Sequence, residues 1–195
     1  MDAVKVAMLR EVLAQTGWVE RATAFARALR TSVRDPGGLL LVGTPEDEPW
    51  HLAAHLDDES RFHDLPVLAP TLVRWSPPAT APPHLRVGID RIEATRRGEA
   101  LFVVTPQAAP PPLLDRLADA RKVGATVLAL DTGDRELEGL AHEAITVSPD
   151  EPTVSFDGVQ HLVSTAAGEP FDQVSGLRGR LARLLRTVNG PGPES

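Results

Sequence analysis

The stretch Leu39-Leu40-Leu41-Val42-Gly43, four apolar residues that end at a glycine, decides the fold. A continuous apolar run of this length is typical of a strand that is buried on both faces of a sheet. Two further runs of the same kind follow at residues 101–104 and 125–130. Segments with apolar residues at helical spacing separate the three runs, so the sequence predicts strands that alternate with helices.

Helices are expected on both sides of each strand. Apolar residues recur at helical spacing over residues 3–30, with Gly17 as a break between two helices. Pro49 is suited to begin a helix over residues 50–59, because proline lacks only an amide hydrogen that the first helical turn leaves unbonded. Further helices are expected over residues 85–97, 111–123, 135–142, 156–168 and 176–188. Short strands are expected at 67–68 or 72–75, and at 144–147.

This alternation predicts a three-layer α/β sandwich, in which a parallel sheet has helices on both faces. The chain has 195 residues, the length of one domain. We expect that domain to span residues 1–189, with N-terminal helices over 1–34, an α/β core over 38–169, a C-terminal helix over 176–188 and a disordered tail over 190–195. Ligands of such sheets bind at the carboxyl ends of the strands. The loops at residues 43–48, 105–110 and 131–134 are therefore expected to carry the site.

Charge and composition exclude several classes of protein. Twenty Lys and Arg against 27 Asp and Glu give a formal net charge of −7, which repels nucleic acid and anionic membranes, so neither is expected as a partner. The chain has no cysteine, which excludes a disulfide framework, a thiolate nucleophile and cysteine-ligated metal sites. The sequence has no membrane-length apolar run and no secretory signal, so the expected location is the cytoplasm.

Four segments together resemble the sugar isomerase (SIS) domain, most closely its phosphoheptose isomerase branch: Leu39-Leu-Leu-Val-Gly43, His51-Leu-Ala-Ala-His55-Leu56, Gly98-Glu-Ala-Leu-Phe-Val-Val-Thr105 and Ala120-Arg-Lys-Val-Gly-Ala-Thr-Val-Leu-Ala-Leu130. The similarity runs from the N-terminal helices to about Glu169. It implies a five-stranded parallel sheet of flavodoxin-like topology. It also implies association as a homodimer or tetramer, with a phosphosugar site at the subunit interface.

The loops depart from the family's pattern. The loop after the first strand is rich in Gly and Ser in the family, whereas here it reads Thr44-Pro-Glu-Asp-Glu48 and carries three acidic residues. The family's serine-rich phosphate cradle after the second strand is replaced by Thr105-Pro-Gln-Ala-Ala-Pro-Pro-Pro112. Prolines have no amide hydrogen to donate, so phosphate binding is weakened, although the positive end of the following helix dipole remains.

A phosphorylated sugar is the expected ligand, and six residues are candidates to bind it: Thr44, Arg74, Thr105, Gln107, Thr132 and Gln160. The guanidinium of Arg74 is suited to hold a phosphate through two hydrogen bonds, while a solvated surface arginine is the alternative. Thr132 opens the loop after the third strand, and ordinary turn chemistry is its alternative role.

Five residues are candidates for catalysis. Isomerisation moves a proton between adjacent carbons, so it needs a base near neutral pH. The resemblance aligns His51 and His55 with a His and a Glu of the family, which implies that a histidine replaces the carboxylate. Glu48 lies at the start of the same helix as a further acid or base. Asp157 and His161 are four residues apart and share a helix face, but the family's Gln-to-His spacing is not reproduced.

No cofactor is required by this sequence, but His51, His55 and His161 have an alternative role as ligands of a divalent metal such as zinc. Two histidines at positions i and i+4, with a third donor from elsewhere, form a known zinc-binding pattern. Many helices carry such a pair without a metal, so ordinary packed or surface histidines remain the other interpretation.

The resemblance favours a cytoplasmic isomerase or lyase of carbohydrate metabolism that acts on a hexose or amino-sugar 6-phosphate, such as N-acetylglucosamine 6-phosphate. Elimination, including dehydration, begins with the same proton abstraction and stays beside isomerisation. The alternative is a non-catalytic sugar-phosphate sensor or an SIS-derived scaffold that binds a protein through Trp50 or Trp75, which core packing would otherwise explain. A transcription factor is the least favoured form, because residues 1–34 leave no room for a basic DNA-binding module.

Overall fold

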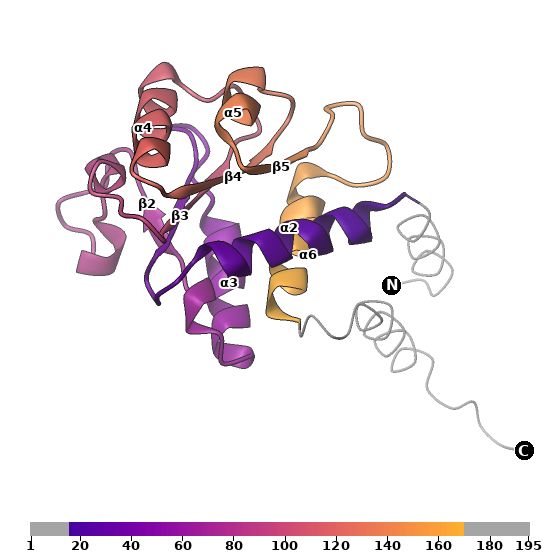
Figure 1. Ribbon diagram of the computed structural model, residues 1–195, viewed down its shortest axis with the longest axis horizontal. Coiled ribbons are helices and arrows are strands. Elements are labelled where there is room, and N and C mark those ends of the chain that lie inside the picture. Colours follow the sequence, from indigo (N-terminus) through magenta and orange to yellow (C-terminus); the bar gives the residue numbers. More distant parts are fainter. Residues whose placement is uncertain (1–15, 170–195) are drawn as a thin grey trace, which may run out of the picture.

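Residues 16–169 are described by the computed structural model of the chain, and they form a parallel sheet between two layers of helices (Figure 1). The strands are β1 (Leu39–Val42), β2 (Thr71–Val73), β3 (Ala100–Val104), β4 (Thr126–Asp131) and β5 (Glu143–Thr146). The helices are α2 (Trp18–Ser32), α3 (Trp50–Phe62), α4 (Pro111–Lys122), α5 (Arg135–Leu140) and α6 (Phe156–Gly168). Three short 3₁₀ helices in this part of the chain are η1 (Pro66–Leu68), η2 (Pro83–Leu85) and η3 (Ile89–Ile92). The predicted three-layer α/β sandwich is confirmed.

The strand order in the sheet is β2-β1-β3-β4-β5, and all neighbouring strands are parallel. Leu40 of β1 pairs with Thr71 of β2 on one side and with Leu101 of β3 on the other. The chain thus leaves β1 toward one edge of the sheet and later returns to continue toward the opposite edge. This is the expected flavodoxin-like order, and its direction reverses between β1 and β3.

The core is formed by side chains that alternate between the two faces of the sheet. Leu39 and Leu41 of β1 are buried on the face covered by α2, α3 and α6, whereas Leu40 and Val42 are buried on the face covered by α4 and α5 (Figure 1). All four side chains have 0% exposure. Burial on both faces explains why the strand is apolar at every position rather than at every second one.

Most predicted elements lie within a few residues of the observed ones, but the helix predicted over residues 85–97 is wrong. That segment contains η3 and part of η2, separated by Gly88 in an extended conformation. The prolines at 82 and 83 and the glycine prevent a continuous helix there. Of the two strand alternatives, 67–68 is wrong, because it lies within η1, and 72–75 overlaps β2.

The second of the two predicted N-terminal helices is α2, which begins at Trp18 directly after Gly17, a residue with a φ of 72°. The first of the two predicted N-terminal helices, the helix predicted over 176–188 and the predicted tail over 190–195 lie outside the described residues. From residue 16 to residue 169, the helices are too short or too polar to cross a membrane.

Phe102 tests the position of the core. Its ring is fully buried in β3, and its centroid lies 5.1 Å from that of Phe25 in α2. We expect Phe102→Ala to lower the free energy of unfolding by about 3–5 kcal/mol, because the substitution leaves a cavity that the core cannot fill. The matched control is Phe62→Ala at the end of α3, where the residue is 80% exposed, and it should change stability by less than about 0.5 kcal/mol. Urea unfolding measures both, and equal effects would contradict this core.

Candidate active site

A pocket of about 330 Å³ lies where the direction of the strand order reverses. Three segments form its walls: the loop after β1 with the start of α3, the end of β3 with the loop that follows it, and the start of α6. The lining residues include Asp47, Glu48, Trp50, His51, Val104, Pro106, Asp157 and Gln160. Open α/β sheets bind their ligands in the crevice at this point. A larger pocket of about 450 Å³ lies between η3 and α4 and contains none of the predicted site residues.

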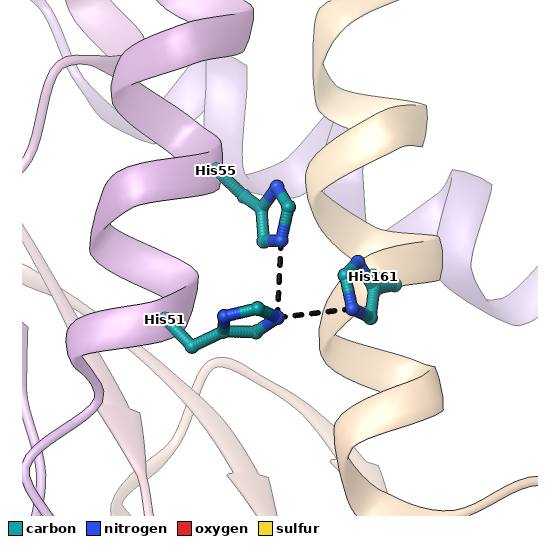
Figure 2. Close-up of side chains that lie close together, drawn as sticks. All are labelled: His51, His55 and His161. Carbon is teal, nitrogen blue, oxygen red and sulfur yellow. Dashed lines mark hydrogen bonds between the residues drawn. The ribbon is translucent and has the colours of Figure 1, made fainter.

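Three of the predicted catalytic residues, His51, His55 and His161, lie close together, as Figure 2 shows. His51 and His55 lie one turn apart on α3, and His161 faces them from α6. The Nε2 atom of His51 is 3.0 Å from Nε2 of His161 and 3.1 Å from Nε2 of His55. His51 also lines the pocket, so it connects this histidine cluster with the pocket.

The histidine cluster has more nitrogen contacts than neutral rings satisfy. A ring nitrogen of a neutral imidazole carries either one hydrogen or one lone pair. Nε2 of His51 faces two other Nε2 atoms, and it therefore makes at most one well-directed hydrogen bond with them. A cation between the three nitrogens would accept a lone pair from each ring and would remove this conflict.

Electrostatics favour the neutral ring at His55. Burial lowers the pKa of His55, and the imidazoles of His161 and His51 lower this pKa further, while the Asp58 carboxylate acts in the opposite direction. A neutral imidazole with a free lone pair is the form that binds a metal ion.

The donor set fits a zinc ion. One ring nitrogen from each histidine lies within 4.8 Å of those of the other two, and within residues 16–169 this is the one group of three or more His and acidic residues so arranged. Zinc–nitrogen bonds of about 2.0–2.1 Å around a tetrahedral ion place the nitrogens roughly 3.4 Å apart. The two separations from His51 Nε2, 3.0 and 3.1 Å, are close to that spacing. Three histidines also leave the fourth tetrahedral position for water or substrate, as in catalytic zinc sites.

Glu48 and Arg74 form an ion pair at the rim of the pocket. Arg74 Nε lies 2.8 Å from Glu48 Oε2, and Trp50 donates its indole N–H to the same oxygen at 2.9 Å. The Arg74 guanidinium also lies over the Trp50 ring, 4.6 Å from its centroid. Arg74 could bind a phosphate, and Glu48 could act as a base, only if this ion pair opened. The two side chains are only 17% and 14% exposed.

The two tryptophans differ in their surroundings. Trp50 is 41% exposed at the pocket rim. Trp75 is partly buried against the core on the α4 side of the sheet and donates its indole N–H to the Gly43 carbonyl oxygen at 2.9 Å. The structure thus places Trp75 in the packing role and leaves Trp50 accessible.

The predicted threonines stabilise the loops from within. Thr44 is buried, and its hydroxyl accepts a hydrogen bond from the Asp47 amide at 3.1 Å. Thr105 is also buried and donates its hydroxyl to the Gln107 carbonyl oxygen. Thr132 donates its hydroxyl to the Pro106 carbonyl oxygen at 3.1 Å, which supports the turn role named as its alternative. All three hydroxyls thus have partners within the protein.

The Asp134 carboxylate accepts hydrogen bonds from backbone amides, one of them in the loop after β3, and the sequence analysis did not identify this role. One of its oxygens accepts the Ala109 amide at 2.7 Å, and the other caps α5 through the amides of Glu136 and Leu137. The helix α4 begins with Pro111 and Pro112 after an N-cap proline. An aspartate before a helix signals a cap, but no sequence pattern indicates its second bond to Ala109.

On α6, Asp157 and Gln160 line the pocket, and Gln160 donates its side-chain N–H to Asp157 Oδ1 at 3.0 Å. Ser155 caps the helix by accepting a hydrogen bond from the Gly158 amide at 3.1 Å. The helix thus presents Asp157 to the pocket and His161 to the histidine cluster. Gln107 lies nearby and donates to Asp47 Oδ2 at 3.4 Å.

The lowered pKa of His55 gives a test in metal-free protein. A histidine whose folded pKa lies below the ordinary value of about 6.5 adds stability above that value, and this stability is lost as the pH falls through the folded pKa. We expect the NMR titration of the His55 ring to have its midpoint below 6.5, and the free energy of unfolding to rise with pH over that interval. Replacement by Gln should flatten this rise. A His55 midpoint at or above 6.5 would contradict the described surroundings.

No family model matches the chain, and no curated protein matches its sequence. Solved structures do match it. A protein named as a phosphosugar isomerase from Silicibacter pomeroyi has a TM-score of 0.55 at 15% identity, over 94% of this chain and 53% of that one. A protein named as sugar-binding from Salmonella typhimurium has a TM-score of 0.55 at 16% identity, over 96% and 54%. The sugar isomerase domain of an RpiR transcription factor from Sphaerobacter thermophilus has a TM-score of 0.51 at 14% identity, over 93% and 91%.

This chain spans about half the length of the first two structures and nearly all of the third. The three matches carry different functional names, so they do not single out the phosphoheptose isomerase branch, which stays a prediction. Together with the strand order and the position of the pocket, they show that the chain has the fold of the sugar isomerase (SIS) domain.

Proposed function

We propose that the protein is an SIS-type isomerase or lyase that acts on a hexose or amino-sugar 6-phosphate, with a divalent metal held by the histidine cluster. The observation that supports this proposal is the convergence of His51, His55 and His161, with Nε2 separations of 3.0 and 3.1 Å, beside the ligand crevice of the sheet. Sugar phosphates are favoured as substrates because one protein of the same fold is named as a phosphosugar isomerase and another as sugar-binding.

The residues of the pocket suit proton transfer next to a carbonyl group. A metal bound at the histidine cluster supplies Lewis-acid polarisation of the carbonyl oxygen. Since the three imidazoles then serve as ligands, the base must be another group, and the Asp157 carboxylate lies in the pocket wall one turn before His161. Gln160 orients Asp157 through its hydrogen bond. Isomerisation returns the proton to the former carbonyl carbon, whereas elimination expels a substituent from the carbon on the other side of the deprotonated one, in the β position to the carbonyl.

A second candidate function is a non-catalytic sugar-phosphate sensor or protein-interaction scaffold. The loop after β3 favours this function, because it offers few amide donors for a substrate phosphate. The Ala109 amide already donates to Asp134, and the first turn of α4 has prolines in place of amide donors. One protein of the same fold is named as a transcription factor. The exposed Trp50 at the pocket rim would be the contact for a partner. Association as a dimer or tetramer and a cytoplasmic location stay predictions under either function.

Zinc binding tests the role of the histidine cluster. We expect protein freed of metal by a chelator to bind one equivalent of zinc in isothermal titration. His51→Ala, His55→Ala and His161→Ala should each weaken binding more than the roughly 10–100-fold that loss of an outer-shell partner costs. His84→Ala in η2 is the control, because this exposed histidine lies outside the cluster, and it should leave binding unchanged. Unchanged zinc affinity in all three cluster variants would contradict the metal role.

Substrate binding and turnover distinguish the two functions. A sugar 6-phosphate at 100 times its dissociation constant should stabilise the zinc-loaded protein by about 2.7 kcal/mol, which raises the unfolding midpoint by roughly 5–10 °C. We expect Asp157→Asn to lower kcat by about 10²–10⁴-fold with little change in KM, because it removes the base and keeps the shape. A ligand-induced shift without turnover would favour the sensor, and the absence of any shift would favour the scaffold.

A further inference from the structure

A fully buried carboxyl group that the proposed function does not use lies at the carboxyl end of β4. Asp131 has 0% exposure. Its Oδ1 atom accepts a hydrogen bond from the Gly133 amide at 2.6 Å, but among residues 16–169 no group donates to its Oδ2 atom. An ionised carboxylate oxygen that is buried without a donor costs free energy. The geometry at Oδ2 therefore suits another form of the carboxyl group.

The Thr146 hydroxyl is the neighbour of this carboxyl group. Asp131 and Thr146 are partners in the pairing of β4 with β5, so their side chains lie side by side on one face of the sheet. Thr146 donates the one hydrogen of its hydroxyl to Glu138 Oε1 at 2.7 Å. Its oxygen therefore faces Asp131 with lone pairs alone, and the two carboxyl groups share a single hydroxyl.

A proton on Asp131 Oδ2 resolves this arrangement. A protonated carboxyl group donates one hydrogen bond and still accepts others. Oδ2–H would donate to Thr146 Oγ1, Thr146 would continue to donate to Glu138, and Oδ1 would keep the Gly133 amide. Each hydrogen in this chain of groups then has an acceptor. The buried side chain thus fits its surroundings as a neutral acid.

The charges around Asp131 favour the same form. Burial raises the pKa of Asp131, and the Glu138 carboxylate of α5 raises this pKa further, while hydrogen bonds from two loop amides and from the Thr146 hydroxyl act in the opposite direction. From α2, Arg21 donates to the Thr146 carbonyl oxygen at 3.2 Å. No Lys, Arg or His between residues 16 and 169 forms a salt bridge with Asp131.

The loop that follows β4 connects this carboxyl group with the pocket. Thr132 donates its hydroxyl to the Pro106 carbonyl oxygen at 3.1 Å, and the Asp134 carboxylate accepts a hydrogen bond from the Ala109 amide at 2.7 Å. Pro106 lines the pocket. If Asp131 ionised, its buried charge would lack a donor, and the loop would have to move to admit water. The loop after β3 would then lose its support.

We propose that Asp131 is a positioning residue whose protonated form holds the loop after β4 against the loop after β3, and that its ionisation releases this part of the pocket wall. The link to ligand binding rests on the proposed function, because the wall belongs to the same site. A carboxyl group with a raised folded pKa adds stability that is fully present below its unfolded pKa and is lost as the pH rises through the folded pKa. Ligand binding should weaken over the same interval.

NMR titration of the full chain tests the positioning role without a ligand. We expect the Asp131 carboxyl carbon to titrate with a midpoint above about 3.9, the ordinary value for aspartate. The backbone amide of Gln107, which follows Pro106 and is bonded to the Thr105 hydroxyl at 3.2 Å, should shift with the same midpoint. A midpoint at or below the ordinary value, or a Gln107 amide that does not follow Asp131, would overturn the inference.

Three variants separate the effect of the proton from that of the carboxylate. Asp131→Asn keeps the shape and carries permanent N–H donors for Thr146, so the Gln107 amide should lose this titration step and the urea midpoint should lose its fall with pH. Glu138→Gln keeps an acceptor for Thr146 but removes a negative charge, so the Asp131 midpoint should fall. Asp119→Asn replaces an exposed carboxylate of α4 and should leave this midpoint unchanged. Either a Gln107 titration retained in Asp131→Asn or an Asp131 midpoint unchanged in Glu138→Gln would overturn the inference.

Ligand affinity tests the link to the pocket. Over the interval of the Asp131 titration, we expect the affinity of the zinc-loaded protein for glucose 6-phosphate to fall at least about threefold relative to that of Asp131→Asn at the same pH. Equal pH dependence in parent and variant would overturn the inference and leave the proposed function standing. If no hexose or amino-sugar 6-phosphate binds at any pH while Gln107 follows Asp131, the proposed function fails and the positioning role stands.

Discussion

The reversal of strand order between β1 and β3 is the constraint on which the site depends. Because β1 has β2 on one side and β3 on the other, the chain segments that follow β1 and β3 leave the sheet in opposite directions and a crevice opens between them. The strand holds this central position because Leu39, Leu40, Leu41 and Val42 are all fully buried, which requires helices on both faces. The loop after β1 then leads directly into α3, and α6 packs on the same face of the sheet and covers the crevice.

The pairing of α3 with α6 produces the histidine cluster at the side of this crevice (Figures 1 and 2). Three imidazoles in contact are unfavourable once protonated, since each positive charge repels the others, and burial further disfavours a charge on His55. Neutral rings with converging lone pairs suit a metal ion. The pocket next to the cluster is lined by the carboxylates of Asp47, Glu48 and Asp157, of which Glu48 is paired with Arg74. The described residues thus place a candidate metal position beside a carboxylate that is available as a base.

Features that depend on local sequence could be predicted, and features that depend on contacts between loops could not. The buried strands and α6 follow from apolar runs and periodicity, and the i, i+4 spacing places His51 and His55 on one helix face. Residue His161 was a candidate through its helix alone. The pair Glu48–Arg74 joins residues 26 apart, and the Asp134–Ala109 bond joins residues 25 apart. Neither has a local signature, so the sequence leaves Arg74 as either a phosphate ligand or a surface arginine and does not single out Asp134.

The proposed function depends most on a metal ion at the histidine cluster, and X-ray absorption spectroscopy at the zinc edge of the zinc-loaded protein tests this directly. We expect nitrogen donors at about 2.0–2.1 Å, with outer-shell scattering from three imidazole rings and a fourth light ligand. The His161→Ala variant should lose one ring from that pattern. Scattering from oxygen donors alone, or from fewer than two imidazoles, would contradict it, and the three histidines would then be a surface cluster without a metal role.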